Sequence, residues 1–175
     1  MKKLIGIVSL LLAICMMLGS CATSEGGDNT YANFKPEKPD DTELEFWVGD
    51  DVSSYDFSDY EMIENDIGFD IYYGKGYSSK DADNYVKYVI SSGKVVSIVI
   101  TDPDVDVWGI STETSKYDFV DYFEFNGYRV EELAYSADEY TYWYSATKGR
   151  FSVKYKRGDG DIEIRIVYDI PDDDI

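Results

Sequence analysis

The sequence predicts an α+β fold in which two tandem repeats, each a short helix followed by an antiparallel β-meander, share one sheet and place their helices on one face of it. Three observations predict this architecture. The hexapeptide Tyr55–Tyr60 (YDFSDY) recurs as Tyr117–Tyr122 (YDFVDY) with one residue changed. Segments that alternate apolar and polar residues, typical of strands with one buried face, follow each copy. Glycine-containing turn sequences separate these segments.

Further matches between the two halves keep the same order along the chain. Val86-Lys87-Tyr88 and the later apolar run 95–100 correspond to Val153-Lys154-Tyr155 and the later run 162–168. Chance similarity in a chain rich in Tyr and Asp would not usually preserve this order, so we interpret the pattern as a duplication. The predicted units are residues 44–106 and 107–171.

A short helix should open each repeat. In the second repeat Ser115 and Asp118 form a start that resembles a capping box, and Asn126-Gly127 supplies a left-handed stop. In the first repeat Ser53 or Ser54 is the expected cap. The expected buried stripes are Phe57, Tyr60 and Ile63 in the first helix and Phe119, Val120 and Phe123 in the second.

Three strands are predicted after each helix. The run 95–100 is almost continuously apolar, which is typical of a central strand. Ser91-Ser92-Gly93 is the expected turn before it. The predicted strands are Phe69–Tyr73, Tyr85–Ile90 and Lys94–Thr101 in the first repeat, and Tyr140–Ser145, Phe151–Lys156 and Ile162–Tyr168 in the second.

This tandem of helix and meander, with Gly109-Ile110-Ser111 before the second helix and Asn126-Gly127-Tyr128 after it, resembles the repeats of β-lactamase inhibitory protein. It is also similar to the single repeat of the small lipoprotein in the outer-membrane barrel-assembly machinery. The resemblance implies a binding module without catalysis.

The first twenty residues have the pattern of a secretory signal. Basic residues precede an apolar run over 4–18, which is shorter than the roughly 20 residues that a transmembrane helix needs. The run ends at Leu18-Gly19-Ser20-Cys21, which resembles the bacterial lipobox. That resemblance implies cleavage before Cys21, attachment of palmitate-type lipid to its thiol, and a lipid-anchored protein on the extracytoplasmic face of the cell membrane. The alternatives are an uncleaved N-terminal helix or an ordinary secretory signal.

The chain between the lipid and the folded domain should be a tether. Residues 22–43 are rich in Gly, Pro, Ser, Asp and Glu and contain no apolar run, so they cannot bury enough surface to offset their ordering entropy. The predicted organisation is a signal peptide at 1–20, the lipidated cysteine and tether at 21–43, the two repeats, and an acidic tail at 172–175.

Composition excludes several classes of function. With 35 Asp and Glu against 16 Lys and Arg the formal charge is −19, which disfavours nucleic-acid binding. The chain has no histidine, so His-based triads and imidazole metal ligands are absent. Cys15 leaves with the signal peptide and Cys21 carries lipid, so no disulfide is expected in the mature domain.

One acidic loop has the spacing of calcium ligands. Numbered from Asp102, acids fall at positions 1, 3, 5 and 12 of a calcium-binding loop. Val107 stands where the sharp turn of such a loop requires Gly, and the loop follows a strand rather than a helix. The alternatives are a calcium-dependent surface domain and a solvated connector between the repeats. The four candidate ligands are Asp102, Asp104, Asp106 and Glu113.

A partner surface is predicted from aromatic and basic residues on the second repeat. The segment 140–144 has aromatic rings on both faces of one strand, and the 17 tyrosines combine rigid contact area with a hydroxyl. If the apolar residues of the last two predicted strands face the core, the residues that alternate with them face outward and form a small cationic strip. The core-facing residues are then Phe151, Val153, Tyr155, Ile162, Ile164 and Ile166, and the outward-facing ones are Lys154, Lys156, Glu163 and Arg165. The alternative is that the rings only pack the sheet. The candidate partner-binding residues are Tyr72, Tyr142, Trp143, Tyr144, Lys154, Lys156 and Arg165.

These expectations combine into a lipid-anchored extracytoplasmic module that binds a protein or an envelope polymer and has no catalytic residue and no cofactor. An envelope glycan hydrolase is an alternative, since it requires only two suitably placed acids, but no acid pair stands out among so many.

Overall fold

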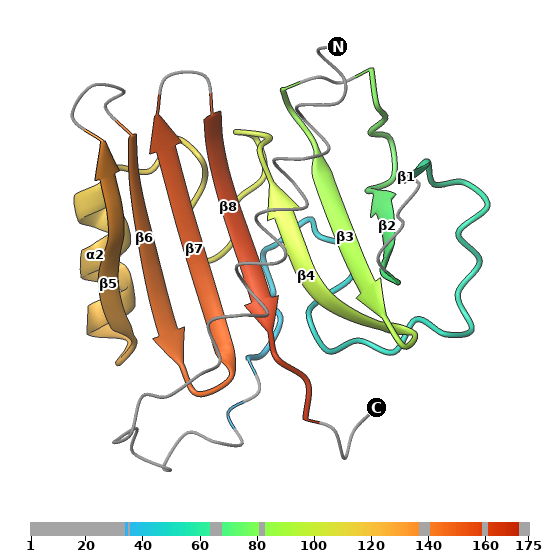
Figure 1. Cartoon of the computed structure of the whole chain (residues 1–175), viewed down its shortest axis with the longest axis horizontal. Coiled ribbons are helices and arrows are strands. Elements are labelled where there is room, and N and C mark those ends of the chain that lie inside the picture. The colour runs from blue at the N-terminus through green and yellow to red at the C-terminus, as the bar shows by residue number, and fades with distance from the viewer. Residues whose placement is uncertain are drawn as a thin grey trace.

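The computed structural model describes residues 34, 36–63, 68–80, 83–136, 141–158 and 161–171. In this part of the chain one helix lies against a single antiparallel sheet of eight strands, so the chain is an α+β protein as predicted (Figure 1). The elements are β1 (Met62–Ile63), β2 (Asp70–Tyr73), β3 (Val86–Ser91), β4 (Lys94–Ile100), α2 (Lys116–Phe125), β5 (Arg129–Ser136), β6 (Thr141–Lys148), β7 (Phe151–Gly158) and β8 (Asp161–Tyr168).

The strands lie in the order β1-β2-β3-β4-β8-β7-β6-β5. β1–β4 and β5–β8 are each a meander of antiparallel neighbours. The two meanders meet where β4 pairs with β8, with Ser97 opposite Val167 and Val99 opposite Arg165. β4 is therefore a central strand, as its apolar sequence predicted.

The helix α2 begins and ends where the sequence predicted. The Ser115 hydroxyl accepts a hydrogen bond from the Asp118 backbone N–H at 3.2 Å and donates one to the Asp118 carboxylate at 2.7 Å. Asn126 is the C-cap, and Gly127 follows with a φ of 75°, in the region that favours glycine. Phe119 and Phe123 are buried against the sheet. Figure 1 shows α2 behind β5 at one edge of the sheet.

The predicted helix at the start of the first repeat is wrong. Residues 53–60 form turns, and no helix precedes α2 among the described residues. The carboxylates of Asp51 and Asp56 each accept a hydrogen bond, at 3.0 Å, from the backbone N–H two residues later. Such local side-chain bonds hold the backbone in turns and compete with the helix. In the part of the chain that the structure describes, the sheet therefore has one helix on its core side rather than two.

The predicted strands are present with small shifts at their ends, but two strands were missed. β1 has only two residues. β5 lies at the sheet edge, and its pairing with β6 shifts register between Glu132 and Ala134. This bulge interrupts the alternation of apolar and polar residues, so β5 lacks the pattern by which strands are recognised.

The core lies between one face of the sheet and a layer formed by α2 and the segment 44–60. Trp47, in the segment 44–60, is 2% exposed. Its indole N–H donates to the Pro36 carbonyl at 3.0 Å, and its ring lies 5.4 Å from that of Trp108. We call this side of the sheet the core face and the other the open face. The core face carries Val86, Tyr88, Ile90, Ile98, Ile100, Phe151, Val153, Tyr155, Ile164, Ile166 and Tyr168.

Several predicted features lie outside the described residues. These are the signal peptide, Cys21, the tether as far as residue 33, and the tail at 172–175. The last part of the predicted tether contacts the domain, since Pro36 and Pro39 are buried. Within the ranges that the structure describes, no helix has the length and apolar character needed to cross a membrane.

Candidate functional site

The seven predicted partner-binding residues divide between the two faces of the sheet. Alternation along β6 places Tyr142 and Tyr144 on the core face and Trp143 on the open face. Tyr72 of β2 also packs against the core. The structure therefore brings together only four of the seven candidates on the open face: Trp143, Lys154, Lys156 and Arg165.

The three candidate tyrosines on the core face, Tyr72, Tyr142 and Tyr144, pack at the edges of the core. Tyr72 stacks on Phe57 with ring centroids 4.4 Å apart. The ring centroids of Tyr142 and Tyr144 lie 5.8 Å apart. The Tyr144 hydroxyl donates to the Glu132 carboxylate at 2.7 Å. Burial, together with this hydrogen bond, raises the pKa of Tyr144 to about 12. The geometry of these three tyrosines therefore fits the alternative in which the rings only pack the sheet.

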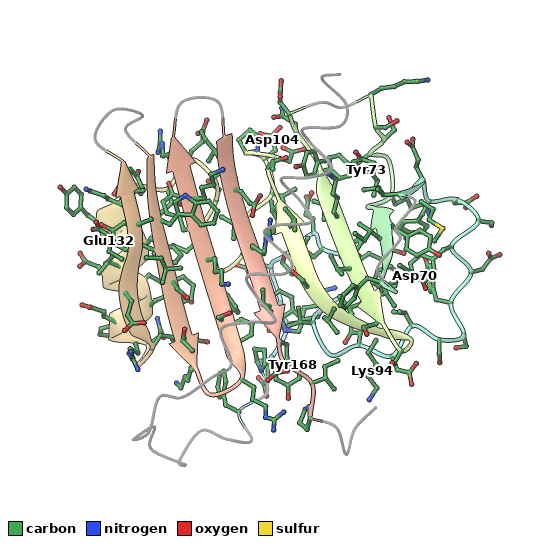
Figure 2. The ribbon with its side chains drawn as sticks, in the orientation of Figure 1. Asp70, Tyr73, Lys94, Asp104, Glu132 and Tyr168 are labelled. Atoms are coloured by element: carbon green, nitrogen blue, oxygen red, sulfur yellow. The ribbon has the colours of Figure 1, made fainter. Side chains whose placement is uncertain are left out.

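On the open face, basic residues from three strands lie in one line across the sheet. Lys154 of β7 pairs with Arg165 of β8, Arg165 with Val99 of β4, Val99 with Lys87 of β3, and Lys87 with Tyr73 of β2. Neighbouring strands are about 4.8 Å apart, so this line spans roughly 19 Å. Figure 2 shows Tyr73 of β2 in one half of the sheet and Glu132 of the edge strand β5 at the far side of the other half.

A second line of pairs runs beside the first. Trp143 of β6 pairs with Lys156 of β7, which pairs with Glu163 of β8. Cross-strand neighbours on one face have side chains close enough to interact. We define the cationic row as Lys87, Lys154, Lys156 and Arg165.

Arg165 is the centre of the cationic row. It is 7% exposed, and its guanidinium donates from one terminal nitrogen to the Glu163 carboxylate at 2.6 Å. Its Nε is buried and has no hydrogen-bond partner among the described residues. Burial lowers the pKa of Lys154, and the charge of Arg165 lowers it further. Burial also lowers the pKa of Lys87, and Glu163 only partly offsets this.

Aromatic rings accompany the lysines. The Lys156 ammonium lies 4.9 Å from the centroid of the Trp143 ring. The Lys87 ammonium lies 3.8 Å from the Tyr85 ring and 4.8 Å from the Tyr73 ring. These are distances at which a cation is attracted to an aromatic face.

Lys87 belongs to the site but was not predicted. The signal for it was present, since Val86-Lys87-Tyr88 corresponds to Val153-Lys154-Tyr155 and Lys87 therefore corresponds to Lys154. What the sequence did not reveal was the pairing of β4 with β8. That long-range pairing places Lys87 two strands from Arg165.

Comparison with known proteins adds no relative. The chain matches no protein-family model, no curated protein and no solved structure. The resemblance to helix and meander repeats therefore stays an expectation from the sequence, and the site is interpreted from its geometry.

The acidic loop after β4 is organised by its own hydrogen bonds. The Asp102 carboxylate accepts from the Tyr77 hydroxyl at 2.9 Å and from the Asp104 backbone N–H at 2.9 Å. The Asp106 carboxylate accepts from the Gly109 backbone N–H at 3.2 Å, while Glu113 is exposed. Asp104 lies beyond the end of β4 (Figure 2). Among the described residues no group of three or more acidic or thiol side chains is placed to hold a metal ion, and the calcium site stays a prediction.

A small cavity of about 150 Å³ lies between β3, the loop that follows β2 and the segment 43–45. Two acids, Glu43 and Glu45, line it with Tyr77 and Tyr88. Burial raises the pKa of Glu45, but hydrogen bonds from Tyr60 and Tyr55 outweigh this and hold that pKa below its usual value. A glycosidase acid needs a raised pKa, so Glu45 in this setting does not suit that role.

Proposed function

We propose that this chain is a lipid-anchored extracytoplasmic binding protein that holds a partner on its open sheet face and has no catalytic role. The single observation that carries the proposal is the cationic row. Three strands bring Lys87, Lys154, Lys156 and Arg165 together in a chain whose net charge is −19. Charge complementarity guides encounter and selects partners, so such a local reversal of sign favours a partner of opposite charge.

Capture experiments test this proposal. Lys154→Ala and Arg165→Ala should each weaken retention of envelope components by the immobilised full-length protein, while the fold, followed by circular dichroism, persists. Lys80→Ala is the matched control, because Lys80 is exposed and lies outside the cationic row. Equal capture by all variants and the wild type would contradict the proposal.

The anchor is proposed from the lipobox resemblance of Leu18–Cys21. When cells that express the protein are fed an alkyne-tagged palmitate analogue, the wild type should become labelled and Cys21→Ala should not. Cys15→Ala is the matched control and should still be labelled, because Cys15 would be removed with the signal peptide. Loss of label in both variants, or in neither, would contradict lipidation at Cys21.

We also propose that the domain arose by duplication of a meander. The strand order supports this, because two meanders of four strands lie on either side of the β4–β8 pair. The matching triplets support it as well, since Val86–Tyr88 lies in β3 and Val153–Tyr155 in β7, the third strand of each meander. The first repeat would then have replaced its helix by the turns at 53–60.

A further inference from the structure

The starting observation is the incomplete pairing of Arg165. A buried donor without an acceptor costs free energy, and native proteins rarely keep one without a reason. One terminal nitrogen of Arg165 already donates to Glu163, whereas its Nε has no partner in the described part of the chain. The open face therefore holds a preformed donor group with unused capacity.

The neighbours of Arg165 increase the local positive charge. Lys154 lies directly opposite it on β7, and Lys87 lies opposite Val99, the residue that pairs with Arg165 on β4. Glu163 is the acid that pairs with Arg165, so three cations share one internal carboxylate. No described residue forms an ion pair with Lys154. The desolvated lysines, whose pKa values are lowered, would gain from a further negative charge.

We propose that the open face binds an acidic polypeptide segment, with a carboxylate of that segment accepting hydrogen bonds from Arg165 between Lys154 and Lys87. This inference rests on the proposed binding function and names the chemistry of the partner. Guanidinium groups bind carboxylates with paired, charge-assisted hydrogen bonds. Glu163 takes up one terminal nitrogen of Arg165 and leaves Nε unused.

Two observations favour a polypeptide over an anionic glycan or a polyphosphate. The rings of Trp143, Tyr85 and Tyr73 already have ammonium groups over them, which leaves them less open to stack on sugars. Half-buried aliphatic side chains, Val89 and Val167, lie on the same face and suit the apolar side chains of a peptide.

The test uses the lipidated full-length protein in detergent and fluorescein-labelled oligo-L-glutamate, followed by fluorescence anisotropy at low salt. We expect the wild type to bind despite its net negative charge. Arg165→Gln should weaken binding about tenfold or more, because it removes hydrogen bonds to a charged group. Glu163→Gln should strengthen binding by releasing the guanidinium from its internal partner. Lys80→Gln is the matched control and should leave binding unchanged.

The double variant Glu163→Gln/Arg165→Gln keeps the test valid if Arg165→Gln alone unfolds. It removes both members of the ion pair, so neither charge is left buried alone. It should fold, as circular dichroism would show, and should also bind at least about tenfold more weakly than the wild type.

Three outcomes would overturn the inference: equal binding by the double variant and the wild type, tighter binding of polyphosphate or polygalacturonate than of oligo-glutamate, and Arg165-dependent self-association in sedimentation velocity. Envelope capture that depends on Arg165 without oligo-glutamate binding would reject the acidic polypeptide while leaving the proposed function intact. Envelope capture that is indifferent to Arg165 would reject both.

Discussion

At the scale of single residues, tyrosine has two roles that depend on the sheet face. On the core face, Tyr155 and Tyr88 bury their rings and reach polar groups at the rim with their hydroxyls, as amphipathic aromatic residues usually do. On the open face side, Tyr73 and Tyr85 place their rings against the Lys87 ammonium. The abundance of tyrosine therefore does not by itself mark a binding surface, and the surface proposed above rests on the basic residues.

The structure predicts that Tyr155 stabilises the domain through both its ring and its hydroxyl. Its ring stacks on Phe119 of α2 at 5.2 Å and is fully buried, and its hydroxyl donates to the Thr114 carbonyl. Tyr155→Phe should lower the free energy of unfolding by about 1 kcal/mol, since it removes one hydrogen bond. Tyr155→Ala should lower it by about 3 to 5 kcal/mol through cavity formation. Urea denaturation measures both, and equal losses in the two variants would contradict this division.

At the scale of elements, α2 depends on its N-cap. The Ser115 hydroxyl is the side-chain acceptor for the Asp118 N–H at the start of the helix. Ser115→Ala should lower the free energy of unfolding by about 1 kcal/mol, whereas Ser115→Asn should leave it nearly unchanged because Asn also caps helices. Thermal denaturation of the two variants measures the difference. An equally large loss in Ser115→Asn would mean that the serine acts through packing rather than capping.

The calcium alternative concerns the loop that follows β4. The Asp102 carboxylate already accepts hydrogen bonds from Tyr77 and Asp104, so a cation would have to displace them. Calcium that bound only the folded state would raise the melting midpoint. We expect no such binding, so the midpoint should be the same with calcium and with a chelator. A calcium-dependent rise that disappears in Asp104→Asn would instead support the calcium alternative.

The predictable elements were those with local signals. Neighbouring residues determine the cap and stop of α2 and the alternation along β7 and β8. The bulge in β5 breaks that alternation, and the turns at Asp51 and Asp56 replace the helix that the apolar spacing predicted. In both cases a local hydrogen-bond or register choice overrides the hydrophobic period.

The candidate site was predictable only in part for the same reason. Lys154 and Arg165 face outward because their neighbours in β7 and β8 face the core, and this could be inferred from alternation. Lys87 joins them through the pairing of β4 with β8, which connects residues far apart in the sequence. Such long-range pairing leaves no local mark in the sequence.

At the scale of the whole molecule, the buried and half-buried tyrosines predict a loss of stability at alkaline pH. Burial is the main cause that raises the pKa of Tyr77, Tyr88, Tyr128, Tyr144 and Tyr155 to about 12 each, from an ordinary value of 10.0. Below pH 10 these groups are neutral in both the folded and the unfolded chain, so their contribution is fully present. Between pH 10 and about 12 only the unfolded chain ionises them, and the free energy of unfolding must fall.

The magnitude follows from the two tyrosines that are almost completely buried. Tyr88 and Tyr155 are 2% and 0% exposed, and each should remove up to about 1.4 kcal/mol per pH unit above pH 10. Lys87 and Lys154 act in the opposite direction, because their lowered pKa values let the unfolded chain hold protons that the folded chain has lost. The tyrosines are more numerous, so the melting midpoint should fall steeply above pH 10.

Tyrosinate absorbance should rise together with the loss of circular dichroism, and Tyr88→Phe should flatten the pH dependence. Complete ionisation of all 17 tyrosines near pH 10 with the circular dichroism intact would mean that the core rings are open to water and that the core face is not the closed surface described above.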